Sequence, residues 1–122
     1  NEMIFLAHGM GIAPVVEEVR AVLPNGSSSV ELASVVWFDE NVRNFDIAEK
    51  QLESEYKKYP SKLAVTCIDG DLTKDNPDVE DSVPNFSQGI MAVVSGPASF
   101  AQKAKRYLVE RGYPKDCVCV LP

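Results

Sequence analysis

Five short runs of apolar residues recur along the chain, and longer polar or helix-like stretches separate them. The runs cover residues 3–7, 30–38, 63–68, 90–94 and 117–121. Each run is continuous in its apolar residues rather than alternating with polar ones, which is typical of strands that are covered on both faces. The pattern therefore predicts a parallel β-sheet.

Three of the stretches between the runs place apolar residues at helical spacing. They cover residues 14–24, 46–58 and 97–112. Pro14 stands near the first position of a helix, where proline is tolerated, and Gly112 suits the left-handed conformation that ends many helices. Strands that alternate with helices predict a three-layer α/β/α fold around a five-stranded parallel sheet with right-handed crossovers.

Composition narrows the class of protein. A length of 122 residues suits a single domain, and a net charge of −6 disfavours nucleic acid as a partner, because phosphate binding needs clustered positive charge. Three cysteines make no disulfide framework and favour an intracellular location, cytoplasmic or organellar.

No apolar run approaches the ~20 residues that span a bilayer. Because the chain enters a strand directly after Asn1, we expect residues 1–122 to be one domain of a longer protein.

Residues 69–89 break the alternation of strands and helices. They include six acidic residues, one lysine and two prolines, without sustained periodicity. We predict a solvated excursion here in place of a crossover helix. Asp71 and three other acids have a spacing that superficially resembles a calcium loop, but Lys74 occupies the position that needs glycine. Calcium is therefore not predicted.

Cys117 and Cys119 share one face of a predicted strand, because side chains alternate along a strand. A lone C-x-C pair lacks the second pair of ligands that a zinc site needs. We interpret both as buried small apolar residues, and the sequence predicts no metal site.

Residues 7–14 join the first predicted strand to the first predicted helix. Gly9 and Gly11 allow a tight turn and a close approach of the backbone. The N–H groups at a helix start, with their partial positive charge, form a site for a pyrophosphate. Pro14 stands where the Rossmann pattern G-x-G-x-x-G has its third glycine, so a turn that merely uses glycine stays open as an alternative.

Ser95, Gly96 and Pro97 repeat this arrangement after the fourth predicted strand. If both turns lie at the carboxyl edge of the sheet, they flank the crevice where parallel sheets bind ligands. His8, the only histidine, would lie at a strand tip in this crevice. It could donate a hydrogen bond to a phosphate or act as a proton donor, or it could be a loop histidine without such a task.

The two turns and the segment after the second strand together resemble the NAD(P)-binding domain of the ferredoxin-NADP reductase superfamily. The branch that they resemble most is that of cytochrome b5 reductase and nitrate reductase. The matching residues are Gly9-Met10-Gly11-Ile12-Ala13-Pro14, Asn41, Asp46-Ile47 and Ser95-Gly96-Pro97. The match spans nearly the whole chain in order. It implies a half-Rossmann-like domain with the strand order 3-2-1-4-5.

The resemblance also implies the ligand contacts. The pyrophosphate and the nicotinamide ribose would lie along Gly9, Met10, Gly11, Ile12 and Ala13. The adenosine ribose would meet the segment that holds Asp39, Asn41 and Asp46, while the remaining candidates are His8, Cys67, Gly96 and Pro97. Asp39, Glu40 and Asp46 outnumber Arg43, and carboxylates accept hydrogen bonds from a 2′-hydroxyl but repel a 2′-phosphate. This balance favours NADH over NADPH.

Domains of this kind pass a hydride from NADH or NADPH to FAD on a flavin-binding domain of the same polypeptide. The resemblance implies that electrons then reach a haem or iron–sulfur acceptor, on a further domain or on a separate protein. Because the flavin lies outside residues 1–122, we expect the isolated domain to be inactive.

Three departures from the family pattern fall on the hydride side of the site. Met10 replaces the usual threonine, Ser95 replaces the usual cysteine, and the final residues lack the usual aromatic. Ser95 is the catalytic candidate, as a residue that orients the nicotinamide, although turn chemistry alone would also explain it. The departures leave a catalytically degenerate nucleotide-binding or protein-interaction module open as an alternative, with a phosphate-binding signalling domain of flavodoxin-like shape as a third.

Cys67 closes the third predicted strand next to the crevice. A thiol at that place could be redox-sensitive, or it could be a buried structural residue.

Overall fold

The computed structural model describes residues 2–23, 31–73 and 75–121, apart from the side chains of Ile47, Ala48 and Gln51. The predicted start of the second strand at Val30 and the predicted end of the first helix at Pro24 lie outside the described residues. Within the described part, no helix combines the length and the apolar character needed to cross a membrane.

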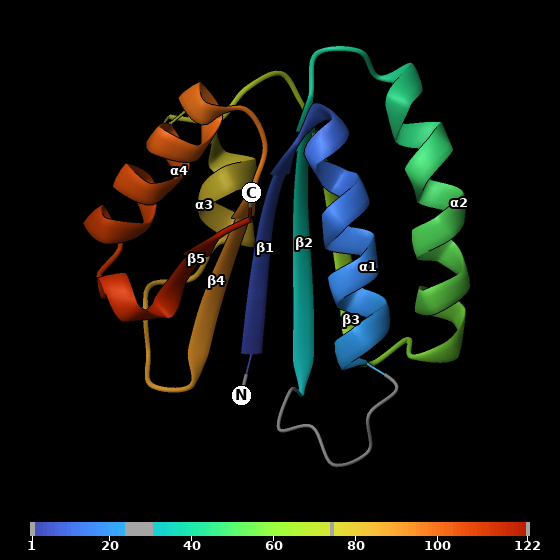
Figure 1. Ribbon diagram of the computed structural model, residues 1–122, viewed down its shortest axis with the longest axis horizontal. Coiled ribbons are helices and arrows are strands. Elements are labelled where there is room, and N and C mark those ends of the chain that lie inside the picture. Colours follow the sequence, from blue (N-terminus) through green and yellow to red (C-terminus); the bar gives the residue numbers. More distant parts are fainter. Residues whose placement is uncertain (1, 24–30, 74, 122) are drawn as a thin grey trace.

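A five-stranded, wholly parallel sheet forms the centre of the domain (Figure 1). The strands are β1 (Glu2–His8), β2 (Leu32–Asp39), β3 (Leu63–Asp69), β4 (Ile90–Ser95) and β5 (Val118–Val120). Their order across the sheet is β3-β2-β1-β4-β5, which confirms the predicted order. Because all strands run the same way, the residues that follow them gather at one carboxyl edge.

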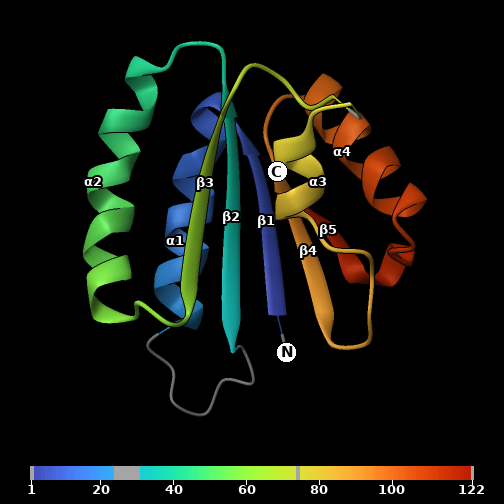
Figure 2. The same cartoon turned by 180° about the vertical axis from the view of Figure 1, so that it is seen from behind.

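Helices cover both faces of the sheet and complete the three predicted layers (Figures 1 and 2). On one face lie α1 (Ile12–Val22) and α2 (Arg43–Lys58), and on the other lie α3 (Pro77–Ser82) and α4 (Ala98–Glu110). Two short 3-10 turns, η1 (Gly9–Gly11) and η2 (Lys115–Cys117), precede α1 and β5. Each helix before a strand thus crosses one face of the sheet, as parallel pairing requires.

The strands β1 and β2 supply the centre of the core to both layers. Ile4 and Leu6 pack toward α3 and α4, whereas Phe5 and Trp37 pack toward α1 and α2. All four side chains are almost fully buried. Burying a side chain of this size contributes about 1.5–3 kcal/mol relative to exposing it, so continuous apolar runs are stable here because helices cover both faces.

The helix α3 corrects the prediction of a solvated excursion over residues 69–89. Asn76 caps it, since its side-chain oxygen accepts a hydrogen bond from the N–H of Asp78 at 2.9 Å. Pro77 stands in the first turn, where its missing N–H is not needed. Val79 and Val83 are fully buried in the core. One buried residue inside so short a helix, and a second directly after it, leave too little periodicity to read from the sequence.

The fifth strand is shorter and less covered than predicted. Cys117 belongs to η2 and not to β5, and it is only partly buried, whereas Cys119 is exposed. Both therefore differ from the predicted buried residues. β5 lies at the edge of the sheet and pairs only with β4 among the described strands, so its outer side has no neighbour to bury it.

Candidate functional site

The two glycine turns touch each other at the carboxyl edge of the sheet. β1 and β4 are hydrogen-bonded neighbours, and Ala7 pairs in register with Ser95, so the two strands end side by side. A Cβ atom added to Gly11 would overlap the carbonyl oxygen of Ser95 and lie 2.9 Å from the Cα of Gly96. The chain thus needs glycine at position 11 because the start of α1 packs directly on the turn before α4.

Gly9 opens this turn for a different reason. Its φ angle is +58°, in the left-handed region that glycine adopts without a steric penalty. A Cβ atom at Gly9 would meet nothing within 4 Å, so the backbone faces open space. The indole N–H of Trp37 donates a hydrogen bond to the carbonyl of Gly9 at 3.2 Å and ties the turn to β2.

The helices that follow these turns begin without a negative group. Neither α1 nor α4 has a side-chain cap or an acidic residue in its first turn. By contrast, α3 is capped by Asn76, and α2 has Asp46 in its first turn. The positive end of a helix dipole attracts anions, so the edge between α1 and α4 is chemically suited to a phosphate group.

The other predicted residues of the glycine turns differ in their exposure. Met10 is 84% exposed, Ala13 and Pro97 are also exposed, and Ile12 is buried in the core beneath α1. Ser95 is only 3% exposed. A direct contact between Ser95 and a nicotinamide ring stays a prediction, which would require the ring to reach into the turn.

Asp39 is buried at the end of β2 and holds the following turn together. Its exposure is 5%, and its carboxylate accepts hydrogen bonds from the N–H of Asn41 at 2.8 Å and from the side-chain amide of Asn44 at 3.1 Å. Asn41 in turn accepts from the N–H of Arg43 at 3.1 Å. Asp39 and Asn41, two of the three residues predicted near the ribose, thus make hydrogen bonds within the turn, while the neighbouring Glu40 is exposed.

Asp46 and Cys67 lie together, away from the glycine turns. They line a cavity of about 740 Å³ between α2 and β3. The other lining residues are Glu49, Lys50, Leu52, Glu53, Tyr56 and Val65. Cys67 is exposed and not a buried structural residue. Partial burial of its thiol, and secondarily the carboxylate of Glu49, raises the pKa of the thiol. This environment disfavours the reactive thiolate.

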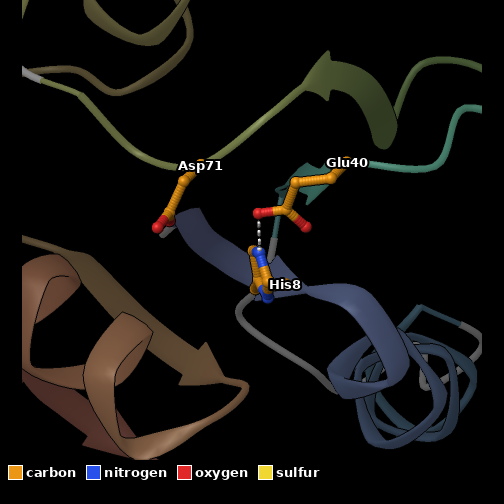
Figure 3. Close-up of side chains that lie close together, drawn as sticks. All are labelled: His8, Glu40 and Asp71. Atoms are coloured by element: carbon orange, nitrogen blue, oxygen red, sulfur yellow. Dashed lines mark hydrogen bonds and ion pairs between the residues drawn. The ribbon is translucent and has the colours of Figure 1, made fainter.

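His8 lies at the tip of β1, as predicted, and contacts residues from two other elements. Its Nε2 atom is 2.9 Å from the Oε1 atom of Glu40 (Figure 3). Its ring stacks on Phe100 of α4 with 5.2 Å between ring centroids. A Cβ atom on Gly96 would lie 3.2 Å from the Cβ of His8, so the base of the His8 side chain packs closely on the second glycine turn.

A group that the sequence analysis did not bring together consists of His8, Glu40 and Asp71. One nitrogen or oxygen atom from each lies within 4.8 Å of the others. Burial alone would raise the pKa of Asp71, but the Lys103 ammonium at 2.7 Å and the N–H of Leu72 more than offset it, so the pKa is lowered. Asp71 is therefore ionised at neutral pH.

Comparison with known proteins identifies the fold. No protein-family model matches the chain, and no curated protein matches its sequence. Three solved structures superpose on nearly all of it. The cytochrome b5 reductase domain of Ulva prolifera nitrate reductase has a TM-score of 0.82 and 17% identity, covering 98% of this chain and 48% of that one.

The other two structures are the CS-b5R domains of human Ncb5or in the NAD+ form and flavohemoglobin from Malassezia yamatoensis with bound FAD and haem. The human structure has a TM-score of 0.79 and 18% identity, covering 100% of this chain and 37% of that one. The Malassezia structure has a TM-score of 0.71 and 19% identity, covering 99% and 31%. This chain thus spans about half or less of each matched structure. It shares their fold, which confirms the resemblance at the level of fold.

Proposed function

We propose that this domain binds a nicotinamide dinucleotide across the two glycine turns and presents it to a flavin on a separate domain. The observation that carries the proposal is the direct packing of Gly11 on Ser95, which brings the uncapped starts of α1 and α4 to one edge. The likeness to the human structure in its NAD+ form and to the flavohemoglobin with bound FAD supports it.

The diphosphate would lie against residues 9–13. The residues there fit an anion, because the backbone at Gly9 borders open space and the first turn of α1 carries no acid. Gly96 and Pro97 would border the same ligand from the start of α4. Met10, exposed at the tip of the turn, would lie beside the nicotinamide ribose.

The adenosine ribose would meet the turn after β2. Asp39 supports this turn from beneath, and Asn41 shapes it. Glu40 and Asp46 are exposed acids near the end of β2 and the start of α2. The acidic side chains of this segment outnumber its one arginine, Arg43, and their negative charge would repel a 2′-phosphate. We therefore propose NADH in preference to NADPH.

When bound, the nicotinamide supplies the hydride that reduces the flavin. The partners proposed for the domain are therefore a flavin-binding domain of the same polypeptide and, beyond it, a haem or iron–sulfur acceptor. Ser95 would act from within the turn by fixing the backbone that borders the nicotinamide, and the turn would keep its shape because Gly11 packs on it.

The alternative is a module that binds the nucleotide or a protein partner without hydride transfer. Two side chains favour it: Met10 has no hydroxyl, and the hydroxyl-bearing Ser95 is only 3% exposed. Stopped-flow reduction of the flavin by NADH in the full-length protein separates the two. Rapid reduction supports the reductase, and an unreduced flavin with bound NADH supports the module.

Isothermal titration of the domain with NADH, NADPH and ADP tests nucleotide binding itself. We expect NADH to bind more tightly than NADPH, and ADP to bind with part of the affinity of NADH because it retains the diphosphate. The absence of heat with all three ligands, in protein shown to be folded by circular dichroism, would overturn the proposal.

A further inference from the structure

Three neighbouring strands each place one metal-ligating side chain at the same edge of the sheet. His8 is the last residue of β1, Glu40 follows β2 directly, and Asp71 lies two residues after β3. These strands are adjacent and parallel in the order β3-β2-β1. In Figure 3 His8 and Glu40 point toward each other and Asp71 lies beside them, and one ligand atom of each lies within 4.8 Å of the others.

His8 already holds the orientation that a metal ligand needs. Stacking on Phe100 fixes the ring plane, and Nε2 points at the carboxylate of Glu40. Their separation of 2.9 Å is shorter than the roughly 3.4 Å between two ligands that each lie about 2.1 Å from one tetrahedral ion, so Glu40 would shift by about 0.5 Å to admit the ion. Because a carboxylate only accepts hydrogen bonds, Nε2 carries the proton in this contact, and a metal ion at Nε2 would have to displace that proton. At Nδ1, no described residue provides a hydrogen-bond partner.

The charges at this cluster suit a divalent cation. Glu40 and Asp71 supply two carboxylates. Lys103 now neutralises part of that charge through its 2.7 Å contact with Oδ2 of Asp71. The Lys103 side chain is half exposed and can turn into solvent. Carboxylate oxygens also keep further lone pairs when they accept one hydrogen bond.

We propose that His8, Glu40 and Asp71 form a binding site for a divalent transition-metal ion, with Zn²⁺ as the type. One imidazole nitrogen and two carboxylate oxygens suit Zn²⁺, Mn²⁺ or Fe²⁺, whereas Mg²⁺ and Ca²⁺ favour oxygen ligands alone. The Glu40 side chain is 61% exposed, so water can reach the cluster and complete the coordination. The His8 ring of this site contacts Phe100 of α4.

The test is a calorimetric titration of the nucleotide-free, chelator-treated domain with ZnCl₂. All three cysteines are replaced by serine in every protein used, so that thiols cannot bind the ion. We expect one Zn²⁺ per chain, no displacement by excess Mg²⁺, and a higher melting temperature with Zn²⁺. His8→Gln and Glu40→Gln should each weaken binding at least about tenfold, since even the partners of metal ligands contribute about 10- to 100-fold.

Two control variants sharpen the result. Asp75→Asn removes an exposed acid of the same segment outside the cluster and should leave Zn²⁺ affinity unchanged. Lys103→Gln removes the competing cation and should tighten binding. Because Glu40 is exposed, Glu40→Gln stays informative if His8→Gln is unstable. Absence of Zn²⁺ binding, or binding that is equal in Glu40→Gln and the parent, would overturn the proposal, whatever the outcome with NADH.

Discussion

Gly11 packs so closely on Ser95 that any side chain at position 11 would overlap the Ser95 carbonyl. The two residues are 84 positions apart in the numbering (95 − 11) and meet because β1 and β4 are neighbours in register. This one contact joins the starts of α1 and α4 into a single surface. The nucleotide proposal depends on that surface staying intact.

Gly11→Ala should therefore destabilise the fold and separate the two turns. Overpacking of this kind costs about 1–3 kcal/mol in the free energy of unfolding. Urea denaturation measures the change. Ala13→Ser, on an exposed residue of the same helical turn, is the control and should stay within about 0.5 kcal/mol of the parent. An equally stable Gly11→Ala variant would show that the two turns do not pack as described.

Asp39→Ala should lower stability more than Glu40→Ala. The first change leaves the N–H of Asn41 and the amide of Asn44 without their acceptor, which costs about 1–3 kcal/mol. Glu40 is exposed, and its pairing with His8 contributes about 1 kcal/mol or less. Thermal denaturation of both variants measures the difference. Equal losses of stability would contradict a structural role for Asp39.

The domain should lose stability in alkali through Tyr113. Burial raises the pKa of this phenol to about 12, and its hydroxyl donates a hydrogen bond to the carbonyl of Pro84 at 3.0 Å. An unfolded tyrosine ionises near pH 10, so the unfolded chain loses this proton first. The stabilisation is complete below about pH 10 and disappears as the pH rises through about 12.

Denaturation at several alkaline pH values, compared with Tyr113→Phe, measures this effect. The parent should lose stability more steeply than the variant between pH 10 and 12. Parallel curves would show that Tyr113 does not ionise differently in the folded and unfolded chains.

Cys67 should react slowly with iodoacetamide at neutral pH. Burial and the Glu49 carboxylate raise the pKa of its thiol, and the thiolate is the reactive form. In a protein that keeps only this cysteine, Glu49→Gln should speed the reaction by removing the negative charge. Glu53→Gln is the matched control, because Glu53 lines the same cavity but does not raise the pKa of Cys67. An unchanged rate in Glu49→Gln would rule out the electrostatic explanation.

Local sequence was sufficient to predict the glycine turns and the strands that precede them. Gly9, Gly11 and Pro14 act through backbone geometry within a few residues, and the apolar runs report their burial directly. The strand order followed from the resemblance and is confirmed. By contrast, α3 depends on only two buried valines, Val79 and Val83, in a segment dominated by acids.

The contacts of the side chains at the carboxyl edge of the sheet were harder to predict, because they depend on where each strand ends and how the strands pair. Asp39 and Glu40 are adjacent and both acidic, yet Asp39 is the last residue of the buried strand β2 and Glu40 is the first exposed residue beyond it. His8 and Glu40 are 32 positions apart and meet only because β1 and β2 pair as they do. The proposed metal ligands His8, Glu40 and Asp71 come from the ends of three different strands. Their spacing in the sequence therefore forms no recognisable motif.

The most direct test of nucleotide binding changes only the charge at the glycine turn. Gly9 borders open space with a φ angle that both asparagine and aspartate tolerate better than other side chains. Gly9→Asp and Gly9→Asn therefore have nearly the same shape and differ by one negative charge beside the proposed diphosphate. Two unit charges 4 Å apart near a protein surface repel by about 4 kcal/mol before salt screening.

Calorimetric titration of the two variants with NADH provides the measurement. We expect Gly9→Asp to bind NADH at least about tenfold more weakly than Gly9→Asn, a difference of about 1.4 kcal/mol, and we expect added salt to narrow the gap. Equal affinities in two folded variants would show that the diphosphate does not lie at this turn and would contradict the proposed function.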